Sequence, residues 1–348
     1  MPARSSPRRR NGYRPAVEAR HPQRIAAVSR CPTRVDKGVR KLVEVSAVER
    51  LAASPLIDVG IPVGILATGH WRSSERGVSC RFRDRPFHGG HYRPLAGRAD
   101  PLWNEEVAKG GAPYGKPPAA PGLLRTRNWA LSPAGRLILD VQPTWYYTYL
   151  GTNKAVERGT WTGPAQTSDA RALSQLSSSR LANPLTVNIA VVTGSGADRV
   201  VIVQRRGRAV ASAGELYQVS AAGFVDREDE TWPQGPAWRA AAREASEETD
   251  LQLGPEQIDF LTFCRSTRRL HLGLCGVARI PSVPDLPSGP PQHDAFEIDG
   301  LELWPWEPAA IEARLGPVGG WKAFVPLGAA AMVAALAFDF PDWSPRST

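Results

Sequence analysis

Residues 243–248 read Arg-Glu-Ala-Ser-Glu-Glu and lie in a stretch of strong helix formers from Ala237 to Thr249. Spacings of three and four residues place Glu244, Glu247 and Glu248 on one face of the predicted helix. Carboxylates placed in this way repel one another, and the negative end of the helix dipole disfavours them further. A bound cation would relieve both effects, and Mg²⁺ is the natural candidate because it takes oxygen ligands from carboxylates, water and phosphates. The pattern therefore predicts a metal-assisted phosphate site.

The acidic stretch also has an ordinary interpretation as a solvated helix face. Most Glu-rich helices are of that kind, here with an internal ion pair between Arg243 and Glu247, four residues apart. The segments upstream favour a functional site. Residues 185–193 and 199–204 are apolar and β-branched, and the turn-rich residues between them complete a hairpin signature. A further short strand over 217–226 contains a glycine where the backbone can approach a ligand closely.

This order of strand, strand, strand, loop and acidic helix resembles the Nudix hydrolase family. The signature of that family runs Gly, five residues, Glu, seven residues, and then Arg-Glu-apolar-any-Glu-Glu-any-Gly-apolar. Gly223 matches the first glycine, residues 243–248 match the central block, and Leu251 matches the last apolar position. The resemblance covers roughly residues 185–315. It implies an α+β fold, a Nudix-like α/β/α sandwich with a mixed sheet, to which this chain adds an N-terminal extension.

The chain departs from the signature in three places. Gly223 and Arg243 are 20 positions apart rather than 14, so six residues, within 231–236, are inserted. The early Glu of the signature is consequently either Glu228 or Glu230. Asp250 replaces the terminal glycine; because Asp adopts positive φ more readily than most residues, a left-handed helix cap is still expected there. A small residue, the Ala of the central block, fills the apolar slot.

The resemblance implies hydrolysis of a nucleoside diphosphate linked to another group, or of a related pyrophosphate, with Mg²⁺ or Mn²⁺ as cofactor. Under this interpretation Glu247 and Glu248 are the principal metal ligands, and Glu244 is either a third ligand or the general base. Arg243 would orient Glu247 or a neighbouring carboxylate. Three further positions are candidates for binding substrate: Gly223, Glu230 and Glu297.

A second interpretation remains open. The longer loop and the lost glycine are also compatible with a catalytically silent Nudix-like module that binds a nucleotide or regulates a partner. The inserted loop is either a mobile surface segment or a cover in which Trp232 excludes water from the site. In both interpretations the expected partner is a small nucleotide or pyrophosphate, and a homodimer is possible.

Charge and composition divide the 348 residues unevenly. Residues 1–110 carry 21 Lys and Arg against 10 Asp and Glu, a net charge of +11, whereas the remainder has a net charge of −2. We expect residues 1–118 to be a poorly ordered basic leader rich in Arg, Pro and Gly. Residues 119–184 should form an extension packed on the catalytic domain, and residues 185–342 the Nudix-like domain. The leader has no recognisable nucleic-acid-binding fold, so nucleic acid is not an expected partner.

The extension and the C-terminal part contain further predicted elements. In the extension, residues 135–142 indicate a strand, residues 168–176 a helix, and the aromatic run 145–149 a strand packed into a core rather than a surface for stacking bases. Beyond the acidic helix, strands are expected over 258–263, 271–280 and 301–304, and helices over 308–315 and 327–338.

The sequence gives no indication of a membrane or secreted protein. The Ala-rich apolar stretch 327–338 is too short to cross a bilayer, and the leader has no continuous apolar signal region. Four cysteines lack CxxC pairing and zinc-site spacing, which is typical of reduced thiols: Cys31, Cys80, Cys264 and Cys275. We therefore expect a cytoplasmic protein with no membrane partner.

Overall fold

The computed structural model of the protein describes residues 60–89, 92–108, 115–161, 179–207, 216–232, 234–282 and 298–346, together with Leu56 and Leu176. An eight-stranded sheet forms the centre of the described part, in the order β1-β9-β10-β5-β6-β11, with β7 beside β6 and β8 beside β5. Its strands are β1 (Val63–Arg72), β5 (Leu185–Thr193), β6 (Val200–Arg206), β7 (Tyr217–Val219), β8 (Ala221–Phe224), β9 (Ile258–Ser266), β10 (Leu272–Ile280) and β11 (Ile298–Pro305). Strands β5 and β10 run parallel and the other pairs antiparallel, so the sheet is mixed.

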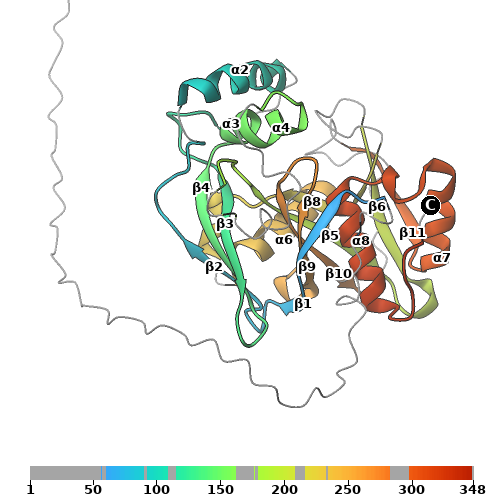
Figure 1. Ribbon diagram of the computed structural model, residues 1–348. Helices are drawn as coiled ribbons and strands as arrows, with labels where there is room; N and C mark the ends of the chain where they lie inside the picture. The colour runs from blue at the N-terminus through green and yellow to red at the C-terminus, as the bar shows by residue number, and fades with distance from the viewer. Residues whose placement is uncertain are drawn as a thin grey trace, which may run out of the picture. The chain divides into compact units, whose positions relative to one another are not determined.

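Two helices sandwich this sheet, as Figure 1 shows. Alternation along β5 directs Val187 and Ile189 into the core that contains helix α6 (Pro236–Thr249). Ala190 and Val192 point into the opposite core, which contains helix α8 (Pro326–Asp339). The predicted α+β fold, an α/β/α sandwich with a mixed sheet, is thereby confirmed.

Helix α8 is the buried C-terminal helix that its composition predicts. All eleven residues from Leu327 to Ala337 are buried, and the small alanine side chains let the helix lie close to the sheet. The helix has 14 residues. Within the described ranges, no helix is both long enough and apolar enough to cross a membrane.

A second, three-stranded sheet covers part of the same face as α6. It has the order β2 (Val78–Phe82), β4 (Leu137–Thr144), β3 (Leu123–Leu131), and its inner side chains, among them Leu124 and Leu139, join the α6-side core. β3 connects this small sheet to the site region, because Leu124 donates its N–H to Val225 O at 3.0 Å. Figure 1 shows a helical group above the small sheet. Its elements are α2 (Tyr92–Ala108), α3 (Tyr146–Tyr149), the π-helix η2 (Leu150–Lys154) and α4 (Ala155–Glu157).

Short helical elements complete the chain. They are η4 (Gly196–Asp198), η5 (Arg227–Thr231), η6 (Pro255–Gln257), α7 (Pro308–Leu315), η7 (Gly316–Val318) and η8 (Gly320–Ala323).

The structure corrects the expected domain boundaries. Residues 63–72 do not belong to a loose leader, since β1 is the edge strand of the central sheet and pairs with β9 from Val63↔Ser266 to Arg72↔Asp259. Strand β2 and helix α2 also lie before residue 118. Composition could not reveal β1, because its mostly half-buried side chains include polar residues and glycine and do not alternate with period two. The basic run of the leader up to residue 55 lies outside the described residues.

The aromatic run 145–149 is another correction. It forms helix α3 and not a strand, although its predicted packing into a core is confirmed: Tyr147 is fully buried and Trp145 is 5% exposed. The alternation of aromatic residues favours a strand, but burial against α2 decides the conformation. The helix predicted over 168–176 lies outside the described residues, apart from its last position.

Candidate functional site

Helix α6 begins and ends where its sequence predicts. Pro236 occupies the first turn, where its missing N–H costs no hydrogen bond. The helix ends at Asp250, whose φ of 58° is left-handed and whose N–H donates to Ser246 O at 3.1 Å. The Asp that replaces glycine thus still forms the expected cap.

Glu244 lies against the backbone of β8 and is 7% exposed. A Cβ atom added at Gly223 would lie 2.0 Å from its Oε1 atom, so any larger residue there would displace the Glu244 carboxylate. Gly223 itself is held in the sheet opposite Val187 of β5. The structure therefore brings together Gly223 and Glu244 of the signature-like segment, which are 21 residues apart in sequence.

Glu248 is the most deeply enclosed acid of the helix, with 4% of its surface exposed. Its Oε2 atom accepts the N–H of Ala222 at 2.6 Å and the side-chain amide of Gln204 at 2.9 Å. Gln204 was not among the residues predicted from the sequence. A signal was present, because Gln204 directly follows the apolar run 200–203, and a buried amide needs a polar partner.

Arg243 lies between the two other glutamates. Its Nη1 donates to Glu244 Oε1 at 2.7 Å and to Glu247 Oε2 at 3.2 Å, and its Nη2 donates to Phe224 O at 2.9 Å. The Glu247 side chain is 40% exposed. The ion pair expected from the four-residue spacing is present, and a shorter one to Glu244 accompanies it.

The loop that precedes the insertion supplies two acids, Asp226 and Asp229, which were given no role from the sequence. Element η5 is closed by a capping box, in which Asp226 N donates to Asp229 Oδ2 at 2.9 Å. Arg243 Nη2 lies 3.4 Å from Asp226 Oδ2 and 3.5 Å from Asp229 Oδ2. Trp232 packs against the α6-side core. The loop acids therefore hold Arg243 from the side opposite the helix glutamates.

Negative charge is in excess at this site. Arg243 and Arg239 provide the ion pairs of the cluster, and the charge of Arg206 acts on Glu248, so three cations face the acids. The carboxylates number five: Asp226, Asp229, Glu244, Glu247 and Glu248.

The excess charge is reflected in the pKa values of the buried acids. Burial raises the pKa of Glu244 to about 8, although Arg243 lowers it, and repulsion from Glu247 adds to the rise. Burial and then the charge of Glu244 raise the pKa of Glu248 well above its usual value. Burial also raises the pKa of Asp226 to about 7. The cluster would therefore take up protons or a cation near neutral pH.

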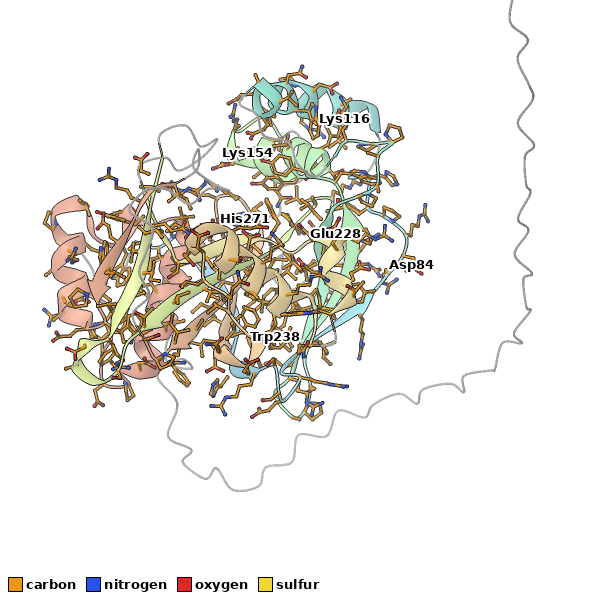
Figure 2. All side chains as sticks on the ribbon, turned by 180° about the vertical axis from the view of Figure 1, so that it is seen from behind. Asp84, Lys116, Lys154, Glu228, Trp238 and His271 are labelled. Carbon is orange, nitrogen blue, oxygen red and sulfur yellow. The ribbon has the colours of Figure 1, made fainter. Side chains whose placement is uncertain are left out.

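The remaining candidates do not join these carboxylates. Glu228 is exposed, and Glu230 has Arg227 and Asp84 as its electrostatic neighbours rather than any acid of α6. Figure 2 shows Glu228 and Asp84 on the side of the small sheet. Glu297 lies outside the described residues.

The carboxylate oxygens of the cluster are the kind of ligand that a hard divalent cation prefers. Every ligand would be a carboxylate oxygen, and the local charge favours a cation. The acids are nevertheless not gathered as a ligand set: within the described residues, no group of three or more His, Cys, Asp or Glu side chains is arranged to hold a metal ion. Arg243 Nη1 is bonded to both Glu244 and Glu247 and takes the place that a shared cation would need.

No family model and no curated protein matches the sequence. Solved structures do match. A MutT/nudix family protein from Enterococcus faecalis is 20% identical over 35% of this chain and 43% of its own, with a TM-score of 0.28. The NUDIX domain of Shewanella oneidensis NrtR, complexed with ADP ribose, is 18% identical over 40% of this chain and 78% of its own, with a TM-score of 0.28.

A C. elegans Ap4A hydrolase, solved as a binary complex, is 15% identical over 39% of this chain and 90% of its own, with a TM-score of 0.27. The chain spans less than half the length of the Enterococcus faecalis protein. The candidate site is defined by the geometry of α6, β8 and the loop between them.

Proposed function

We propose that the carboxylate cluster of α6 is a cation-dependent hydrolytic site for a nucleoside diphosphate derivative or a related pyrophosphate. The observation that carries the proposal is the burial of Glu244 and Glu248 beside each other with too few cations to neutralise them. Keeping such a cluster is costly for a protein that gains only structure from it, since an apolar core of similar volume is usually at least as stable.

Glu244, Glu247 and Glu248 would hold Mg²⁺ or Mn²⁺. When bound, the ion would neutralise phosphate charge and polarise a phosphorus–oxygen bond as a Lewis acid. The chain itself fixes the acids. The N–H of Ala222 and the amide of Gln204 orient Glu248, and Arg243 orients Glu244 and Glu247.

The chain also offers two candidates for the base that removes a proton from the attacking water. Glu244, with a pKa of about 8, and Asp226, with a pKa of about 7, both titrate near neutral pH, where general bases are most effective. Asp226 Oδ1 is buried without a hydrogen-bond partner. It is therefore the carboxylate oxygen whose lone pairs remain available to a substrate or a water molecule.

A hydrolysis panel tests the proposal. Purified full-length protein would be incubated with ADP-sugars, dinucleoside polyphosphates and nucleoside triphosphates, with Mg²⁺, with Mn²⁺ or with EDTA, and release of phosphate or nucleotide measured. We expect turnover of at least one pyrophosphate class that disappears with EDTA. Turnover unaffected by EDTA would contradict a cation-dependent site.

The arrangement of Arg243 favours a second candidate, a module that binds a nucleotide without hydrolysing it. In that case Arg243 would remain between Glu244 and Glu247, as it lies in the structure. Calorimetry with ADP-ribose separates the two functions. Binding with equal affinity in EDTA and in Mg²⁺, without turnover, would favour the silent module.

A further inference from the structure

The outer face of the small sheet is rich in arginine. Strand pairing sets Arg81 of β2 beside Asp140 of β4, and Arg125 of β3 beside Gln142 of β4. The chain continues beyond β2 with Arg83, whose N–H donates to Val141 O at 3.0 Å and extends the ladder by one residue. Arg85 follows, and its carbonyl accepts the side-chain amide of Gln142. We call Arg81, Arg83, Arg85, Arg125 and Arg127 the arginine face.

The arginine face makes no ion pair among the described residues. None of its five guanidinium groups lies within 4.0 Å of a described carboxylate. Some exposed arginines elsewhere are ion-paired, for example Arg205 with Asp299 at 3.9 Å and Arg314 with Glu302 at 4.0 Å. The arginine face is distinguished by having five arginines without such a pair on adjoining strands. Asp84 lies within the run 81–85 and Asp140 lies beside Arg81, and the five arginines outnumber these two acids, which leaves a net charge of +3.

Arg125 shows most clearly that this positive charge has no partner inside the protein. It is 2% exposed, and its Nε and Nη2 atoms are buried without a hydrogen-bond partner. Its guanidinium lies 3.7 Å from the ring centroid of Phe87. Burial and the nearby charge of Arg127 lower its pKa to about 9, so it remains charged at neutral pH. An unpaired buried cation is costly, and an external anion would offset the cost.

The aromatic residues between these arginines indicate which anion fits. Residues 81–88 read Arg-Phe-Arg-Asp-Arg-Pro-Phe-His. Phe82 is 41% exposed on the edge strand β2, and Phe87 is half-buried beside Arg125. Because side chains alternate along β2, Phe82 points to the side of the strand opposite Arg81. A polyanion that runs along this edge would meet the arginines on one side and the Phe82 ring, on which a base can stack, on the other. A lipid headgroup or an acidic peptide would use the charges but would have no need of the rings.

We propose that the arginine face is a binding surface for single-stranded nucleic acid, separate from the carboxylate site of α6. Arg81, Arg83 and Arg85 contact successive phosphates, and Phe82 stacks on a base. Arg125, held on Phe87, supplies the charge at the inner end of the face. Nucleic-acid binding at the arginine face does not depend on hydrolysis at the carboxylate site, so either proposal can fail without affecting the other.

Fluorescence anisotropy with labelled oligouridine and oligothymidine tests the proposal on the full-length protein at several salt concentrations. The R81A/R83A/R85A variant should bind at least tenfold more weakly than wild type. Its slope of log K against log salt should fall by about 2, because each lost phosphate contact removes about 0.7 from the slope for single strands. Its pyrophosphate turnover should be unchanged. Thermal melting would verify folding, which we expect to persist because all three side chains are exposed.

The R205A/R314A/R346A variant is the matched control, since it removes the same charge from exposed, ion-paired arginines. It should bind within about twofold of wild type, because its three arginines lie outside the arginine face. Equal weakening in both triple variants would attribute binding to net charge and overturn the proposal. The proposal would also be overturned if the protein did not bind the single strands at all. Tighter binding to duplex DNA or to phosphatidylserine vesicles than to the single strands would overturn it as well.

If R81A/R83A/R85A fails to fold, the F82A variant provides the test. Loss of base stacking on Phe82 should weaken binding severalfold, and unchanged affinity would contradict the assignment.

Discussion

The carboxylate cluster of α6 and the arginine face both concentrate charge of one sign, but they do so at different depths. Glu244 and Glu248 are buried, and burial raises the pKa of each. Arg81, Arg83 and Arg85 are exposed, where water screens their mutual repulsion. Buried excess charge must be neutralised by a proton or a cation, whereas exposed excess charge persists and attracts a polyanion. Depth therefore decides which kind of ligand each region would take.

The largest effect is expected from removing one charge of the buried cluster. Glu247→Gln and Glu248→Gln should each lower kcat/KM for a pyrophosphate at least 100-fold, about 2.7 kcal/mol of transition-state stabilisation. Stability of the metal-free protein should stay level or rise, because repulsion is relieved. Steady-state kinetics and urea unfolding measure the two effects. Glu256→Gln changes an exposed glutamate outside the cluster and should leave both activity and stability unchanged. Full activity in either cluster variant would contradict the proposal that α6 carries the hydrolytic site.

Removing one arginine from each region compares the regions directly. Arg243→Met leaves Glu244, Glu247 and two loop acids without their shared cation, and we expect a loss of about 2–3 kcal/mol in unfolding free energy at pH 8. Arg125→Met replaces a buried cation that has no partner with an apolar side chain, so stability should change by less than about 1 kcal/mol or increase. Urea denaturation measures both. Equal destabilisation would mean that Arg125 has a compensating interaction.

Gly223→Ala tests the close packing at the site. The added Cβ would lie 2.0 Å from Glu244 Oε1, and relieving that overlap should cost about 1–3 kcal/mol of stability and displace the carboxylate. Gly300→Ala in β11 is the control, because a Cβ there meets no atom within 4 Å. Unfolding free energies and turnover would be compared for the two variants. If Gly223→Ala were as stable and as active as wild type, Glu244 could not depend on this contact.

The smallest expected effect is a pH dependence of stability in the absence of metal. Glu244 has a folded-state pKa of about 8, above its unfolded value of about 4.5. Folding therefore favours the protonated form, and this contribution is fully present below pH 4.5 and is lost as pH rises to about 8. Between pH 7 and 8, in EDTA, wild type should lose about 1 kcal/mol more stability than Glu244→Gln. Urea denaturation of both proteins at the two pH values measures the difference. Identical losses of stability would show that folding does not raise the pKa of Glu244.

Elements with a strong local pattern could be predicted from the sequence. Helix α6 follows from its helix-forming residues, and its end at Asp250 follows from the tolerance of Asp for positive φ. Strands β5, β6, β9 and β10 lie where apolar β-branched runs predict them. These signals depend on neighbours within a few residues, and such neighbours are visible in one sequence.

Other parts of the site could not be predicted in this way. Asp226 and Asp229 reach Arg243 only because η5 folds back toward α6, and Gln204 meets Glu248 only because β6 passes beneath the helix. The helical conformation of 146–149 also depends on packing against α2. Each of these contacts joins segments that are distant in the sequence, and no repeating residue pattern indicates that they meet.

By itself, the sequence determined the acidic helix, the glycine that faces it and the alternation of strands around them, since each follows from local propensity and spacing. Only the tertiary structure decided that β1 completes the central sheet, that Arg243 is shared by acids of two elements, and that five arginines come together in the small sheet without an ion pair among the described residues. The physical reason is that burial and charge pairing are set by residues distant in the chain, which the fold alone brings together.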